Sequence, residues 1–317
     1  MTARGADLLA LPVRAMVRTM SRSFRIAIAW LLAAEACYAV MRVTTRLSAS
    51  TSTLPWAEIA AVRFLGGALV PLASARVRGV TLRASDQKNA WLRSLFGTGG
   101  ALSLFYALGT HSLSVGDATT LYSTAPLWVA VLSGPVLGER VGVSVGLAVV
   151  AGFVGVATLL RSGLTNVGPT GLIVLLGACS YALAIFRVRR LSVSESSEAI
   201  GFHMSITAGL AMLAIALPHL QPIPREAWLP LALSALSGGI GQTIVAKAYA
   251  HESASKLAAF TYAGVVFTYV LEVILFRRVP EAHQVLGALI VIAAGVFVSV
   301  AAARRTSRVA AVQGPGE

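Results

Sequence analysis

Glu35 is the ionisable residue whose position most directly suggests chemistry. It lies near the middle of a long apolar stretch at 24–45, and charged groups within a membrane are costly enough to be treated as functional by default. A carboxylate desolvated at that depth holds its proton more tightly. We therefore expect Glu35 either to couple proton movement to a solute or to bind a cationic group of that solute. The alternative is a structural role, with Glu35 paired inside a helix bundle.

The residues around Glu35 recur in the second half of the chain. Leu31–Ala39 contains Tyr38, and the similar stretch Val174–Ala182 contains Tyr181 but has Ala178 in place of the glutamate. Aromatic side chains with a polar tip suit the wall of a ligand site, because they stack and also hydrogen-bond. For each aromatic residue taken singly, helix packing or an interfacial belt is the alternative. Together these residues define a predicted substrate site with the members Glu35, Tyr38, Tyr122, Trp128, Tyr181, Gln242 and Tyr262.

Arg63 and Pro126 are candidates for structural or gating roles. Arg63 lies inside the apolar stretch 55–75, where it either anchors an anionic solute or ties helices together through backbone carbonyls or a carboxylate. We favour the tie. Pro126 lies midway along the stretch 115–137. Proline lacks a backbone N–H and so predicts a kink there, which in a carrier exposes carbonyls to the solute.

The composition of the chain is that of a helical membrane protein. Hydrophobic residues make up 56% and charged residues 12%, with a mean hydropathy of +0.76, whereas soluble domains have about 25% charged residues. Apolar runs of roughly 20 residues cross a bilayer as helices. The sequence predicts an all-α membrane protein with transmembrane helices at 24–45, 55–75, 91–110, 115–137, 142–161, 168–186, 200–218, 228–248, 256–276 and 282–302.

The net charge of +13 reports topology and does not indicate a nucleic-acid partner. Most of the arginine and lysine residues fall in the termini and in alternate connections, on the side of the membrane that holds the N-terminus. Because cytoplasmic connections carry this excess of positive charge, we expect both termini in the cytoplasm. The predicted location is the cytoplasmic (inner) membrane, as a multi-pass protein.

The ten predicted helices divide into two sets of five. Since five is an odd number, the second set enters the membrane from the opposite side, which gives inverted repeats of the kind that enclose substrate sites in transporters. The predicted organisation is a basic cytoplasmic tail at 1–23, a first repeat at 24–163, a second repeat at 164–302 and a cytoplasmic C-terminal tail at 303–317.

Several landmarks resemble the EamA-type carriers of the drug/metabolite transporter superfamily. In the first half they are Val62–Leu65, Ala107–Pro126, Leu137–Arg140, Ala151–Val156 and Leu160–Gly163. In the second half they are Ala248–Tyr249, Ala254–Ser255, Phe260–Tyr262 and Phe276–Pro280. The resemblance covers about 24–302 and implies two EamA repeats. It also implies an acidic residue before the last helix of each repeat, which is Glu139 in the first half, whereas Arg278 stands there in the second.

The sequence therefore predicts a secondary-active or facilitative carrier that moves a small metabolite by alternating access, with protons as a coupling ion through Glu35. We expect a monomer or a homodimer, without a metal, a cofactor or catalytic residues, since the chain has no HExxH, GxSxG or phosphate-cradling glycine motif. The alternative is an intramembrane enzyme that uses buried acid and base residues.

Overall fold

The structure is a computed structural model and describes residues 22–137, 143–159, 168–252 and 257–312. Within these ranges the chain is helical and contains no strand. Five helical segments are long and apolar enough, by length and composition alone, to cross a membrane, namely Arg22–Thr51, Trp56–Arg78, Pro169–Val188, Ser197–His219 and Arg225–His251. Shorter apolar helices are Val143–Leu159, Phe260–Phe276 and Ala282–Val298. The predicted all-α membrane protein is confirmed.

Each of the ten predicted transmembrane segments corresponds to helix in the described residues. The first five are α2 (Arg22–Thr51), α3 (Trp56–Gly67) with α4 (Leu69–Arg78), α5 (Gln87–Gly109), α6 (Val115–Tyr122) with α7 (Ala125–Leu137), and α8 (Val143–Leu159). The second five are α9 (Gly168–Ser194), α10 (Ser197–Ala216), α11 (Arg225–His251), the 3-10 helix η3 (Ala258–Tyr262) with α13 (Ala263–Phe276), and α14 (Ala282–Val312). Several helices extend beyond the apolar runs, for example α2 to Thr51 and α9 to Ser194.

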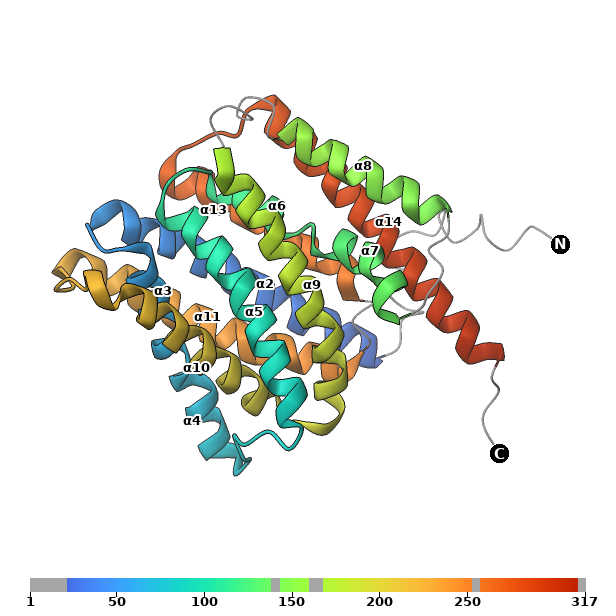
Figure 1. Cartoon of the computed structure of the whole chain (residues 1–317), viewed down its shortest axis with the longest axis horizontal. Coiled ribbons are helices and arrows are strands. Elements are labelled where there is room, and N and C mark those ends of the chain that lie inside the picture. The colour runs from blue at the N-terminus through green and yellow to red at the C-terminus, as the bar shows by residue number, and fades with distance from the viewer. Residues whose placement is uncertain (1–21, 138–142, 160–167, 253–256, 313–317) are drawn as a thin grey trace.

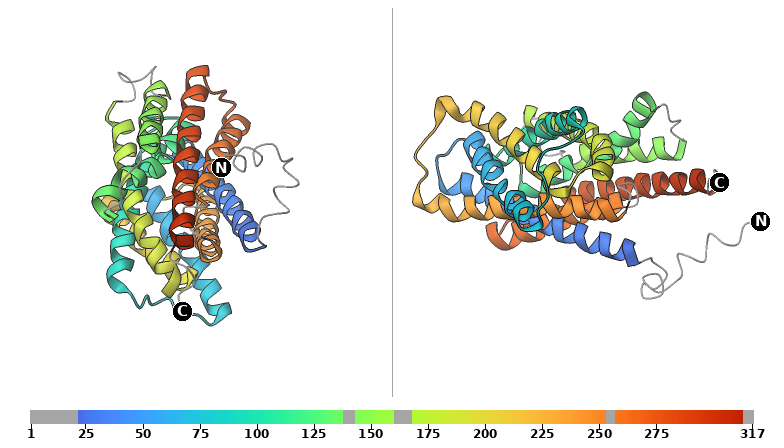
Figure 2. Two further views of the ribbon diagram at one scale, coloured as in Figure 1. Left: turned by 90° about the vertical axis from the view of Figure 1, so that its right-hand side faces the viewer. Right: turned by 90° about the horizontal axis from the view of Figure 1, so that it is seen from below.

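The helix contacts of one half recur in the other half, with each helix replaced by its counterpart. Helix α2 packs along α11, and its counterpart α9 packs along α5, the counterpart of α11. Helices α3 and α10 pack against each other, as do α8 and α14, which lie side by side at one edge of the molecule (Figure 1). Figure 2 shows α2 and α11 running together lengthwise in the view from below. This exchange is the packing expected of two inverted five-helix repeats.

Small residues allow the central helices to approach closely. A Cβ atom built on Gly100 of α5 would lie 3.0 Å from the carbonyl oxygen of Gly177 of α9. At the crossing of α3 and α11, a Cβ atom on Gly67 would lie 3.0 Å from the carbonyl oxygen of Ala235. Helix backbones in membranes approach at such small residues, and the approach brings the side chains of the two repeats together.

The fourth and ninth segments are interrupted at matching places. Helix α6 ends at Tyr122 and α7 begins at Ala125, so the interruption lies just before Pro126. The ninth segment changes from 3-10 to α-helix between Tyr262 and Ala263. Pro126 cannot donate a backbone hydrogen bond to the preceding turn, which explains the first interruption. The second has no proline, and the sequence did not predict it.

Candidate functional site

Glu35 is buried and forms an ion pair within its own helix. Its exposed fraction is 7%, and its Oε2 lies 3.9 Å from Nη2 of Arg42, two turns further along α2. Arg42 Nη1 also donates to the hydroxyl of Thr268 in α13, at 3.4 Å. The pair lies against Gly264 of α13, where an added Cβ would collide with the Glu35 carboxylate. The ion pair expected if Glu35 has a structural role is therefore present.

Tyr38 joins the first repeat to the second beside this pair. Its hydroxyl donates to Oε1 of Gln242 in α11, at 3.3 Å. The guanidinium carbon of Arg42 lies 5.9 Å from the centre of the Tyr38 ring, within the range of a cation–π contact. Gly241 makes room for this ring, because a Cβ there would lie 3.0 Å from it. Tyr38 thus connects Glu35 and Arg42 with the crossing of α2 and α11.

Tyr122 and Tyr181 form the second part of the site. Their ring centres lie 5.2 Å apart, with an interplanar angle of 31°, and Tyr38 interacts electrostatically with both. All three rings are half-buried, although each lies in the middle region of its transmembrane segment. The structure therefore brings five predicted residues together, from α2, α6, α9 and α11. These are Glu35, Tyr38, Tyr122, Tyr181 and Gln242.

Trp128 and Tyr262 contact other helices, although Tyr262 belongs to the buried apolar cluster against which Tyr122 packs. The Trp128 ring stacks edge to face on Phe153 of α8, with centres 5.2 Å apart. Tyr262 is buried, and its ring lies against Gly295 of α14. Both positions follow the helix interruptions. Trp128 comes after the break at Tyr122, and Tyr262 is the last residue of the short 3-10 helix that packs against α14.

Arg63 is almost completely buried and has few partners. Its exposed fraction is 2%, its Nε donates to the sulfur of Met41 at 3.1 Å, and its guanidinium carbon lies 3.9 Å from the centre of the Phe64 ring. Gly238 of α11 faces the guanidinium so closely that a Cβ would lie 2.5 Å from Nη2. Nη1 has no hydrogen-bond partner among the described residues. The tie to carbonyls or a carboxylate that the sequence favoured is not seen in this part of the chain.

Arg93 of α5 is a second buried arginine, which the sequence analysis missed. Its exposed fraction is 7%, and Nε and Nη1 have no hydrogen-bond partner in the ranges that the structure describes. It interacts electrostatically with Tyr38, Tyr122 and Tyr181. The apolar run at 91–110 placed Arg93 at a membrane edge with the cytoplasmic charges. The capping residue Asp86 starts α5 at Gln87, so Arg93 lies almost two turns inside the helix. This start could have indicated that Arg93 is buried.

Polar contacts close the bundle at the end where α6 and α14 begin. The carboxylate of Glu272 accepts hydrogen bonds from the backbone N–H groups of Val115 and Gly116, at 3.0 and 2.7 Å. Asp117 accepts from the hydroxyl of Tyr269 at 2.8 Å and from the amide of Gln284. A carboxylate at a helix N-terminus is favoured by the helix dipole. These contacts join α6 of the first repeat to α13 and α14 of the second.

The opposite end is held by polar contacts between the connections before α5 and α10. Glu195 Oε1 accepts from the backbone N–H groups of Ser85 and Asp86, at 2.8 and 2.9 Å, and from the Ser85 hydroxyl at 2.6 Å. Partial burial opposes ionisation of Glu195, but these hydrogen bonds outweigh it and lower its pKa. A side-chain hydrogen bond from Asn89 lowers the pKa of Asp86. Both carboxylates therefore stay ionised at neutral pH.

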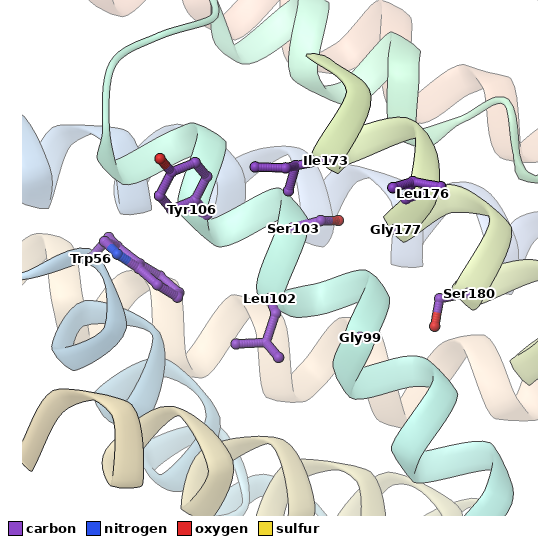
Figure 3. A pocket seen from close by; sticks show the side chains of 9 residues that line it. All are labelled: Trp56, Gly99, Leu102, Ser103, Tyr106, Ile173, Leu176, Gly177 and Ser180. Atoms are coloured by element: carbon purple, nitrogen blue, oxygen red, sulfur yellow. The ribbon is translucent and has the colours of Figure 1, made fainter. Parts of the chain in front are cut away.

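A separate apolar pocket of about 410 Å³ lies between α3, α5 and α9, and Figure 3 shows its lining side chains. Trp56 and Tyr106 close one end in an edge-to-face contact, with ring centres 5.5 Å apart. Leu176 in its wall is 58% exposed, so the pocket lies at the outer surface of the bundle. None of the predicted site residues lines it. Glu139, the remaining predicted residue, lies outside the described residues.

The chain is similar to several curated transporters over most of its length. It is 24% identical over 273 residues to the riboflavin transporter of Vibrio cholerae, covering 85% of this chain and 91% of that protein. It is 26% identical over 272 residues to the pseudopaline exporter CntI of Pseudomonas aeruginosa, covering 85% and 95%. It is 25% identical over 203 residues to the S-adenosylmethionine uptake transporter of Rickettsia prowazekii, covering 62% and 69%.

One crystal structure of a protein shares the fold, with a TM-score of 0.63 and 22% sequence identity. The match covers 88% of this chain and 98% of that chain. The sequence model of the EamA-like transporter family matches twice, at residues 25–161 and 169–300. These ranges correspond to the two sets of helices whose packing is exchanged between the halves. The chain therefore belongs to the EamA-like transporter family.

Proposed function

We propose that this metabolite transporter works by alternating access, as a secondary-active or facilitative carrier, with its substrate site at Glu35, Tyr38, Tyr122, Tyr181 and Gln242. The observation that carries the proposal is the meeting of these side chains from α2 and α6 of one repeat with α9 and α11 of the other. Substrate sites of inverted-repeat transporters lie at such a repeat interface near the membrane midplane. Motion of one repeat against the other then changes which side of the membrane reaches the site.

The direction of the helices follows from the charge distribution of the sequence. With both termini in the cytoplasm, the end closed by Glu272 and Asp117 faces away from the cytoplasm, and the end closed by Glu195 faces it. Access from outside then requires the contacts of Glu272 with α6 and of Asp117 with Gln284 and Tyr269 to break. The interruption before Pro126 and the close contact of Arg63 with Gly238 of α11 support structural or gating roles for these two residues. A gating role for Glu139 rests on its position in the family pattern.

Proton coupling is assigned to the pair of Glu35 and Arg42. A proton on Glu35 removes the ion pair and leaves Arg42 held by Thr268 and by the ring of Tyr38. Tyr38 also forms a hydrogen bond with Gln242 of the second repeat. Release of Arg42 from Glu35 therefore changes the contact between the repeats. This gives a direct route from protonation to the substrate site.

The proposed function is tested in proteoliposomes that contain the purified full-length chain. A mixture of bacterial metabolites is added outside, and mass spectrometry measures what accumulates inside relative to protein-free liposomes. We expect protein-dependent accumulation of at least one metabolite, with its mass unchanged, and a response to an imposed pH gradient. Conversion of a metabolite without accumulation would favour the intramembrane enzyme. The absence of any accumulation would refute the carrier.

A further inference from the structure

The charges buried around the proposed site are unbalanced towards positive. Among the described residues, Glu35 is buried, and so are three arginines in electrostatic range of Tyr122, which are Arg42, Arg63 and Arg93. Glu35 pairs with Arg42 at 3.9 Å. The guanidinium groups of Arg63 and Arg93 form no ion pair with a described carboxylate. This is unusual, because charged groups inside a membrane protein normally pair with one another or with backbone carbonyls.

The surroundings of Arg63 leave hydrogen-bonding capacity unused. Met41 supplies a weak sulfur acceptor and Phe64 supplies a ring face, while Nη1 has no partner in the described part of the chain. The other charged or titratable groups in electrostatic range are Tyr38, Tyr122 and Arg42. None of these is a carboxylate, so the side chain is desolvated without an anion to compensate its charge.

Arg93 has the same deficiency on the other side of the tyrosines. Nε and Nη1 lack partners among the described residues, and a Cβ atom built on Gly97 would lie 4.0 Å from Nη1. His203 is in electrostatic range from α10, but its Nδ1 is already hydrogen-bonded to Ser94 at 2.8 Å. The tyrosines in range are Tyr38, Tyr122 and Tyr181. Again no carboxylate balances the charge.

Tyr38 and Tyr122 interact electrostatically with both arginines, and their rings are half-buried and not enclosed. A guanidinium group offers a planar fork of N–H donors that matches a carboxylate or a phosphate, and charge-assisted hydrogen bonds of this kind are the strong ones. We propose that the transported molecule is a small organic anion, whose carboxylate or phosphate oxygens are bound by Arg63 and Arg93, with the three tyrosines around its body. This inference rests on the proposed carrier function and names its substrate class.

The same arrangement is a poor site for a cation. A cationic solute would have to displace Arg42 from Glu35 and would meet two further positive charges. From the sequence, a cationic group was one possibility for Glu35 and an anionic one for Arg63, and the pairing of Glu35 with Arg42 favours the anion.

The test separates a bacterial metabolite extract into anionic, cationic and neutral fractions by ion exchange. Each fraction is offered to proteoliposomes and to protein-free liposomes at equal ionic strength, and accumulation is measured by mass spectrometry. We expect protein-dependent accumulation from the anionic fraction. Accumulation confined to the cationic or neutral fraction would overturn the anion inference and leave the carrier function intact. No accumulation from any fraction would overturn both. The accumulated compounds then show whether a carboxylate or a phosphate is the bound group.

Substitutions test whether the two arginines bind the accumulated anion. Arg63→Gln and Arg93→Gln should each lower uptake of the accumulated anion by about tenfold or more, the loss expected for a charge-assisted contact. Arg63→Lys and Arg93→Lys should restore part of it, because they keep the charge but lose the planar fork. Arg225→Gln, at the exposed start of α11, is the control. Unchanged anion uptake in both glutamine variants would overturn the assignment, and variants are compared only where they stay monodisperse.

Discussion

The carboxylate of Glu35 and the guanidinium group of Arg42 lie 3.9 Å apart on the same side of α2, two turns from each other. Arg42 reaches α13 of the second repeat through Thr268, and the neighbouring Tyr38 reaches α11 through Gln242. Glu35 is thereby connected to two of the contacts between the repeats.

Glu35→Gln keeps the size of the side chain but removes its charge. We expect accumulation driven by a pH gradient to fall about tenfold or more, as for the loss of a buried charged contact, while exchange without a gradient persists. The measurement compares the two modes in the same proteoliposomes. Glu226→Gln, at the exposed start of α11, is the matched control. Gradient-driven accumulation equal to that of the wild type would show that Glu35 does not couple protons.

Gly264→Ala tests the same pair without changing a charged residue. The added Cβ would meet the Glu35 carboxylate and lie 3.3 Å from Arg42 Nη1, so the pair has to move. We expect loss of gradient-driven accumulation similar to that of Glu35→Gln. Gly146→Ala is the control, because a Cβ at Gly146 meets nothing within 4 Å. Equal transport by the two alanine variants would speak against a role for the pair.

Glu272→Gln weakens the closure at the end where α6 begins. The carboxylate accepts two backbone hydrogen bonds, and the loss of its charge should cost about 1–2 kcal/mol. We expect the closed arrangement to become less populated. The reporter is Leu113→Cys, at a buried position beside α6, in a background where Cys37 and Cys179 are replaced by serine.

A membrane-impermeant maleimide should modify this cysteine several times faster in the Glu272→Gln background. Labelling from outside would also establish which end faces away from the cytoplasm. An unchanged rate, with Glu226→Gln as the reference background, would show that Glu272 does not hold this end closed.

Glu195→Gln probes the opposite end and has a defined pH dependence. Because the pKa of Glu195 is lowered from 4.5 in the folded protein, its ionised form contributes stability above pH 4.5, and this contribution is lost as the pH falls through the lowered pKa. For a partly exposed group we expect about 1 kcal/mol, or roughly 2 °C in the thermal midpoint. The difference between variant and wild type should be present at pH 7 and shrink below pH 4.5. A difference independent of pH would mean that the charge is not responsible.

The overall fold was predictable from the sequence because membrane helices must satisfy their backbone hydrogen bonds internally. Apolar runs such as Arg225–His251 can therefore be identified as helices from the sequence alone. The odd number of segments in each half predicted the inverted repeats. The similarity of the stretches that contain Tyr38 and Tyr181 predicted that corresponding positions of α2 and α9 contribute to one site.

The surroundings of Trp128 and Tyr262 could not be predicted from residue spacing, because the helices are interrupted there. Trp128 and Tyr262 follow or lie within interruptions at positions 123–124 and 258–262, after which the face of a helix can no longer be counted from residue spacing. Arg93 was missed for a different reason. The apolar run 91–110 placed Arg93 near its start and so at the membrane edge, whereas the folded helix begins at Gln87 and buries Arg93.

Counterflow in proteoliposomes distinguishes alternating access from a channel or an enzyme. Vesicles loaded with an unlabelled metabolite that the protein accumulates are diluted into a trace of the same metabolite carrying an isotope label. An alternating-access carrier predicts that the label enters and transiently exceeds its outside concentration, chemically unchanged, only when the inside is loaded. Label entry that is independent of internal loading, or recovery of the label in a different compound, would contradict the account.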